Sequence, residues 1–276
     1  MRKLVLFIHM LIFLQSCGFN MDTDKYSFDN FKSTPIWDLA KAVRADNTDL
    51  IMEILEDDRI ASMIDLKDPK YNQTLLSLAI QDKKNKAFIT LLKKGANPNK
   101  LLGKKMDATP FIDAIWNIED CNLFYVETML KYGANPNLKI KNPNPGYYFE
   151  SSYPLLVAVK VGCIDLIKLL VNNGAKLNCF IRHEPTGLKE GVISSALYSD
   201  NMEALKYFVI EKKVQIPDTV MITGFEKSDK KFYNLREILS TDEYKYDSDN
   251  YGVKKNKSEL RKFRDEVIEY LDKIGK

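Results

Sequence analysis

A five-residue motif that recurs along the chain is the feature that most constrains its fold. Gly-Ala-Asn-Pro-Asn occupies residues 95–99 and again residues 133–137, and the related Gly-Ala-Lys-Leu-Asn occupies residues 174–178. Each copy follows an apolar run with helical spacing. Glycine ends a helix readily because it adopts left-handed geometry without a Cβ penalty, and the proline three residues later cannot continue the helix. The same helix ending at intervals of roughly 40 residues indicates a solenoid of stacked units.

The first half of each unit recurs as well. Thr-Leu-Leu-Ser-Leu-Ala at residues 74–79 corresponds to Thr-Pro-Phe-Ile-Asp-Ala at 109–114 and to Tyr-Pro-Leu-Leu-Val-Ala at 153–158, with a weaker copy at 191–196. Threonine caps a helix and proline fits its first turn, and the recurring alanine predicts a close approach of two helices. This order of helix, turn, helix and glycine motif resembles the ankyrin repeat, although the histidine of Thr-Pro-Leu-His-x-Ala is absent from every copy.

The resemblance implies an all-α fold, namely an ankyrin-repeat solenoid of paired antiparallel helices over residues 34–217. We expect about five units, the first of them degenerate, because single units are too small to bury their own apolar faces. Surplus residues between the units predict long β-hairpin finger loops at 100–107, 138–152 and 179–190. Residues 218–276 are predicted to form a helical C-terminal cap, and a partner-binding helix is the alternative. The apolar face of its last helix comprises Leu260, Phe263, Val267, Tyr270 and Ile274.

The N-terminus has the pattern of an export signal. Residues 1–16 contain a basic start, an apolar run that ends at Leu14, and the small residue Ser16 directly before Cys17. This pattern resembles a bacterial lipoprotein signal, which implies that Cys17 is lipidated and becomes the new N-terminus. An ordinary cleaved signal and an uncleaved anchor are the alternatives. The resemblance places the protein in the bacterial cell envelope, with the outer membrane favoured over the inner because Gly18 follows the cysteine. Residues 17–33 are predicted to be a tether.

Charge and cysteine content exclude several classes of function. The formal net charge is +3, and it falls to +1 without Arg2 and Lys3, which argues against nucleic-acid binding. Besides Cys17 the chain has three cysteines, Cys121, Cys163 and Cys179. An odd number is a poor disulfide framework, so we expect free, partly buried thiols. A Cys163–Cys179 pair would require a loop to fold back. No pattern predicts a metal site, a cofactor or catalysis, and we do not expect an enzyme.

The predicted binding residues are carried over from the ankyrin groove. In that family the position two residues after the recurring alanine points towards the concave face. The corresponding residues are Arg44, Gln81, Trp116, Lys160 and Tyr198. Aromatic residues and arginine dominate interface energetics, which favours a binding role. Alternatively, Trp116 and Tyr198 fill gaps between neighbouring helices.

The second finger adds aromatic candidates. Tyr147, Tyr148 and Phe149 follow a turn-rich Asn-Pro-Asn-Pro-Gly stretch, and they either bind a partner or fold back over the repeat. The resulting hypothesis is an envelope-anchored protein–protein interaction module that binds a protein partner and attaches to the membrane through its lipid. We expect it to be a monomer. The alternatives are an immunity or antitoxin-like protein that neutralises a toxin, a structural envelope lipoprotein without a single partner, and an accessory to a redox enzyme.

Overall fold

The computed structural model describes residues 27–102, 108–141, 151–183, 188–223, 230–240 and 257–276. The predicted signal, Cys17 and the start of the predicted tether lie outside these residues. The helices are η2 (Phe28–Phe31), α2 (Trp37–Arg44), α3 (Thr48–Ile54), α4 (Asp58–Ala61), α5 (Leu75–Gln81), α6 (Asn85–Lys93), α7 (Pro110–Trp116), α8 (Phe124–Lys131), α9 (Pro154–Val161), α10 (Ile164–Asn172), α11 (Val192–Tyr198), α12 (Met202–Lys206), η3 (Tyr207–Glu211), α13 (Leu235–Ser240) and α14 (Lys257–Ile274). The strands are β1 (Ile140–Lys141), β2 (Ser151–Ser152), β3 (Phe180–His183), β4 (Leu188–Gly191), β5 (Val220–Thr223) and β6 (Lys230–Tyr233).

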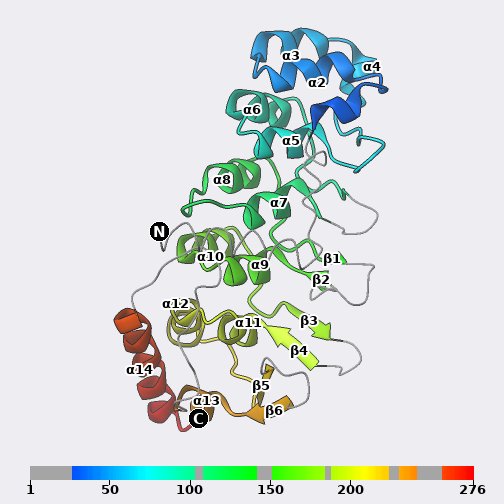
Figure 1. Cartoon of the computed structure of the whole chain (residues 1–276). Helices are drawn as coiled ribbons and strands as arrows, with labels where there is room; N and C mark the ends of the chain where they lie inside the picture. Colours follow the sequence, from blue (N-terminus) through cyan, green and yellow to red (C-terminus); the bar gives the residue numbers. More distant parts are fainter. Residues whose placement is uncertain (1–26, 103–107, 142–150, 184–187, 224–229, 241–256) are drawn as a thin grey trace, which may run out of the picture.

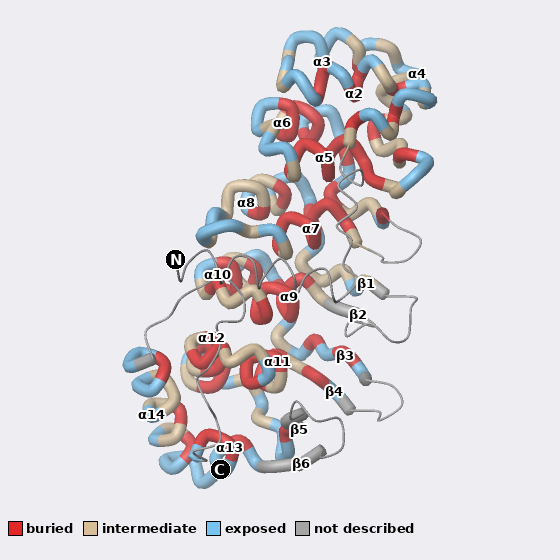
Figure 2. The backbone as a smooth tube through the Cα atoms, in the orientation of Figure 1, coloured by how far each residue is buried: buried red, intermediate tan, exposed pale blue. Residues whose placement is uncertain are grey.

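Ten of the described helices stack as five pairs along one axis (Figure 1). The pairs are α2 with α3, α5 with α6, α7 with α8, α9 with α10, and α11 with α12. The first helices α5, α7, α9 and α11 lie between the second helices and the hairpins, and they are mostly buried (Figure 2). The fold is the predicted ankyrin-repeat solenoid, with hairpins projecting to one side.

The recurring motifs end and start the helices as predicted. Gly95 and Gly133 lie in the left-handed region, with φ of +93° and +86°, where a residue with a Cβ is strained. Thr74 and Thr109 each accept a hydrogen bond on the side-chain oxygen from the backbone N–H three residues later, at 3.3 and 3.1 Å. The recurring alanines are all buried, which agrees with close helix contacts: Ala79, Ala114, Ala158 and Ala196.

The last asparagine of each full motif joins its unit to the next. The side-chain N–H of Asn99 donates to the carbonyl of Gly133 at 2.8 Å, and its Oδ1 accepts from the N–H of Asn135 at 2.8 Å. Asn137 makes the same two bonds, both of 2.8 Å, to the third helix ending. These bonds hold successive helix endings in one register.

The N-terminal end of the solenoid differs from the prediction. Phe28 and Phe31 belong to the short 3-10 helix η2, are 3% and 0% exposed, and pack against the first unit. The prediction of a tether over residues 17–33 is therefore wrong for this segment. Two aromatic side chains three residues apart share one face of a 3-10 helix, and here that face covers the open apolar side of α2.

The C-terminal segment contains both predicted helices and one hairpin that was not predicted. α13 and α14 pack together, and α14 also covers α12 and η3 (Figure 1). Val267 of the predicted apolar face is fully buried, and so is the neighbouring Leu271. Ile274 of the predicted face is instead 47% exposed, because it lies at the end of the helix. The first part of the predicted helical cap forms the antiparallel β5–β6 hairpin and not a helix. This hairpin continues the row of hairpins beyond the fifth unit (Figure 1).

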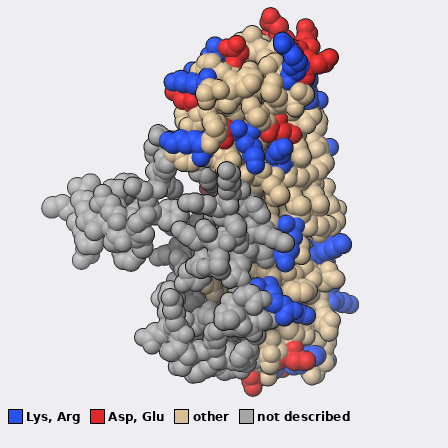
Figure 3. Space-filling view, turned by 90° about the vertical axis from the view of Figure 1, so that its right-hand side faces the viewer, with Lys and Arg blue, Asp and Glu red and all other residues tan. Residues whose placement is uncertain are grey.

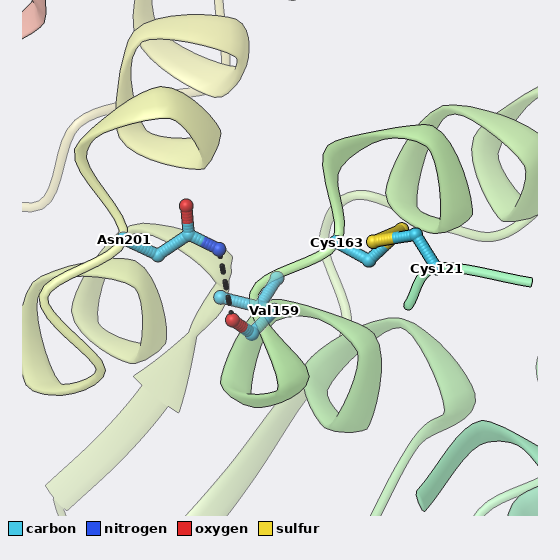
Figure 4. Close-up of a disulfide and its surroundings, with 4 residues drawn as sticks. All are labelled: Cys121, Val159, Cys163 and Asn201. Carbon is cyan, nitrogen blue, oxygen red and sulfur yellow. Dashed lines mark hydrogen bonds between the residues drawn. A yellow bond between two sulfur atoms is a disulfide. The ribbon is translucent and has the colours of Figure 1, made fainter. Parts of the chain in front are cut away.

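The prediction of three free thiols is wrong for two of the cysteines. Cys121 and Cys163 form a disulfide with a Cα–Cα distance of 5.8 Å (Figure 4). Cys121 lies between α7 and α8 and Cys163 lies between α9 and α10, so stacking of the units places these equivalent turns side by side. Cys179 is free and buried, as expected. Beside the disulfide, Asn201 Nδ2 donates to the carbonyl of Val159 at 2.9 Å, which joins the fifth unit to the fourth (Figure 4).

Candidate protein-binding face

The candidate site is the side of the solenoid formed by the first helices and the hairpins. Figure 3 views the molecule from this side. The five residues predicted to line it come from successive units, but their environments differ. Arg44 on α2 is exposed and pairs with Asp29 at 3.1 Å. Its guanidinium also lies 5.8 Å from the ring centre of Trp37, so Arg44 contributes to the N-terminal end of the solenoid.

The middle of the row is more enclosed. Gln81 and Trp116 end the helices α5 and α7 and are both half-buried. Trp116 packs against the hydrophobic core, as the gap-filling alternative predicts, and it is partly accessible. Tyr198 ends α11 and is 57% exposed. It is the most exposed large apolar side chain in the described part of the chain.

Lys160 does not line an open groove. Its side chain is 7% exposed and its Nζ lies 3.0 Å from Oε1 of Glu190, which is 11% exposed. Lys160 belongs to α9, and Glu190 belongs to β4 of the following finger. The pair therefore joins a first helix to a hairpin in the interior of the protein. The ammonium of Lys160 is buried in this pair, so it is not available for the predicted contact with a partner.

The third finger has one buried and one exposed side. β3 and β4 pair antiparallel, with Ile181 opposite Glu190 and Arg182 opposite Lys189. Because successive residues of a strand point to opposite sides, Ile181 and Glu190 face the helices, and Ile181 is 2% exposed. Phe180 on the other side is 40% exposed. Arg182 and Lys189 are exposed with it.

The second finger also begins as an antiparallel hairpin. β1 and β2 pair with Ile140 opposite Ser152, which puts Lys139 next to Tyr153. The Nζ of Lys139 lies 5.8 Å from the ring centre of Tyr153. The predicted binding residues Tyr147, Tyr148 and Phe149 lie outside the described residues, and their role remains a prediction.

Sequence reasoning missed Phe180 and Lys189 as surface residues. The ammonium of Lys189 lies 4.8 Å from the ring centre of Phe180. Phe180, Ile181 and Arg182 are consecutive in a predicted hairpin, so the first and third must share one side and the second must lie on the other. The sequence does not say which side faces the helices, because that depends on the register of the hairpin. In Figure 3, lysine and arginine side chains lie beside the grey segments at mid-height, and acidic side chains are seen at the two ends, at the upper end together with basic ones.

The described residues contain neither a metal cluster nor a membrane-spanning helix. No group of three or more His, Cys, Asp and Glu side chains among them is arranged to hold a metal ion. Within the same residues, no helix combines the length and the apolarity that crossing a bilayer requires. Burial raises the pKa of the Cys179 thiol to about 12, so this cysteine is not a reactive nucleophile.

The stacked helix pairs, the glycine endings and the row of hairpins define an ankyrin-type repeat solenoid. No family model matches the chain. A stretch of 65 residues, 24% of the chain, is 32% identical to Ankyrin repeat and SOCS box protein 2 of Homo sapiens and 34% identical to the Bos taurus protein of that name. This stretch spans only 8% of the length of those curated relatives.

Among the solved structures that match the chain is EF0377, an ankyrin repeat protein, with 21% sequence identity and a TM-score of 0.46. The superposition covers 64% of this chain and 82% of that chain.

Proposed function

We propose that this protein is an envelope-anchored protein-interaction module that binds another protein through its finger side. The observation that carries the proposal is the 57% exposure of Tyr198 at the end of α11. Leu101 and Phe180 on the fingers are also exposed large apolar residues. Tyrosine gives a large contact area and a polar tip to an interface, and an ankyrin-type solenoid offers an extended surface for such contacts.

The proposed location rests on the N-terminal sequence and is supported by the disulfide. A lipid on Cys17 would attach the solenoid to the envelope through residues before η2. The Cys121–Cys163 bond is compatible with export, because disulfides persist in oxidising compartments such as the periplasm. We favour the outer membrane over the inner membrane, as the sequence pattern does.

The binding face is tested by site-specific photocrosslinking in the native cells. A photoreactive phenylalanine analogue replaces Tyr198 in the full chain, and a matched variant carries it in place of Tyr132. Tyr132 is 39% exposed but follows the second helix α8. We expect one partner to crosslink from position 198 and not from position 132. Equal crosslinks from both positions, or none from position 198, would overturn the proposed face.

Copurification of the partner gives a second test of the binding face. Tyr198→Ala should abolish copurification of that partner while leaving the circular dichroism spectrum unchanged, because the side chain is mostly exposed. A toxic partner whose activity is blocked in the complex would specify the immunity-like version of this function.

The lipid anchor is tested by metabolic labelling. Labelled palmitate should be incorporated into the native protein and not into Cys17→Ser, and the variant should be lost from the membrane fraction. Equal labelling would contradict lipidation.

A further inference from the structure

The exposed side of the second and third fingers combines positive charge with aromatic rings. Its exposed charged residues, within the described part of the fingers, are Lys139, Arg182 and Lys189. Tyr153 and Phe180 lie beside them. We call these five residues the basic finger face.

The two fingers repeat one local arrangement. In each of them a lysine ammonium lies over an aromatic ring near the base of the hairpin, at 5.8 Å for Lys139 over Tyr153 and at 4.8 Å for Lys189 over Phe180. Attraction to the ring holds an ammonium in place, so both charges have preferred positions before a partner arrives. The strands β2 and β3 are neighbours (Figure 1), which makes the two arrangements parts of one surface.

The register of the third hairpin turns Glu190, a carboxylate that the structure describes, away from this surface. Glu190 turns inward to Lys160, and it is the only carboxylate among the finger residues whose side chains the structure describes. Arg182 and Lys189 are directly opposite each other across the strands, which places two cationic side chains on one side of the hairpin. The sequence of the three fingers contains seven Lys or Arg residues against four Asp or Glu residues. The fingers therefore carry an excess of positive charge in their sequence.

The geometry points to an acidic segment of the protein partner as the ligand of the basic finger face. Asp or Glu side chains of that segment pair with the cations, and an aromatic or apolar side chain packs on Phe180, which is 40% exposed. This inference rests on the proposed function, because it specifies the partner's chemistry. A protein is favoured over a nucleic acid because the whole chain carries a formal charge of only +3.

Fluorescence anisotropy with the full chain provides the test. The probe is a labelled random copolymer of glutamate and tyrosine, with polyglutamate and a thymidine oligonucleotide of equal length as comparisons. We expect the copolymer to bind more tightly than either comparison. Lys139→Ala combined with Lys189→Ala should weaken its binding by about fivefold, the effect of two partly exposed ion pairs.

Two variants separate a specific face from general charge. Lys93→Ala combined with Lys131→Ala changes the charge equally, but these exposed lysines belong to the last turns of α6 and α8. This control should weaken copolymer binding by less than twofold. Phe180→Ala should weaken binding of the glutamate–tyrosine copolymer more than binding of polyglutamate, because the copolymer loses its apolar contact and both lose the ring that holds Lys189.

Three results would overturn the inference. They are equal losses in the finger and control variants, tighter binding of the oligonucleotide than of the copolymer, and no saturable copolymer binding. The proposed function fails separately. One outcome separates the two proposals. If a partner crosslinks at Tyr198 but binds the Lys139→Ala, Lys189→Ala variant as tightly as the native protein, the protein-binding function stands and the acidic segment is excluded.

Discussion

Lys160 and Glu190 form an ion pair of 3.0 Å that connects α9 to the next finger, with side chains only 7% and 11% exposed. Removing one partner leaves the other charge buried and alone, so Lys160→Met should lower the free energy of unfolding by about 3 kcal/mol. Adding Glu190→Leu should restore most of this loss. Urea unfolding followed by circular dichroism measures both values. Lys273→Met breaks an exposed pair and should change stability little, and a double variant no more stable than Lys160→Met would contradict this account.

Asn137 should contribute to stability through its bonds to the next unit. It donates to the carbonyl of Gly174 and accepts from the N–H of Lys176. Asn137→Ala removes both bonds and should lower the free energy of unfolding by about 2 kcal/mol, whereas Asn137→Asp keeps the acceptor and should lose less. Asn173→Ala is the control, because Asn173 bonds within its own helix end. Equal losses for Asn137→Ala and Asn173→Ala would show that the inter-unit bonds are unimportant.

Asp65 takes the place in the first unit that Asn99 and Asn137 take in later units, and replacing it with asparagine should stabilise the protein. Its Oδ1 accepts from the N–H of Asn97 at 2.9 Å, as Asn99 accepts from the following unit. A carboxylate has no donor for the carbonyl of Gly95. Asp65→Asn supplies that donor and should raise the free energy of unfolding by about 1 kcal/mol. Thermal and urea unfolding check the effect, and a less stable variant would mean that the first unit does not share the geometry of the others.

Reduction of the Cys121–Cys163 disulfide should destabilise the protein. The bond closes a loop of 42 residues and links the third unit to the fourth, so its loss should lower the free energy of unfolding by about 2–4 kcal/mol. Urea unfolding with and without reductant measures this difference. The reductant effect should disappear in Cys121→Ser and persist in Cys179→Ala. A native protein that is insensitive to reductant would show that the bond adds no stability.

The buried thiol of Cys179 predicts a loss of stability at alkaline pH. Burial raises the pKa of this thiol from about 9 to about 12. Between these values the unfolded chain has lost a proton that the folded protein keeps, so the free energy of unfolding falls as pH rises, by about 1.4 kcal/mol per pH unit. Cys179→Ala should remove this part of the slope. Identical pH profiles for the two proteins would contradict it.

Local sequence patterns determined the elements of the solenoid. Gly95, Gly133 and Gly174 end helices because a positive φ suits a residue without a Cβ. Thr74 and Thr109 start helices because their hydroxyls accept from a nearby N–H. These interactions span at most a few residues, so the sequence alone predicted the helix pairs and the hairpins of the second and third fingers.

Tertiary structure decided which side chains remain available at the surface. Lys160 and Tyr198 occupy equivalent positions after a recurring alanine, yet one is buried against Glu190 and the other is 57% exposed. The Cys121–Cys163 bond joins turns 42 residues apart, and the burial of Phe28 and Phe31 depends on the open side of α2. Such contacts depend on how one unit stacks on the next and on hairpin register, which no short sequence pattern specifies.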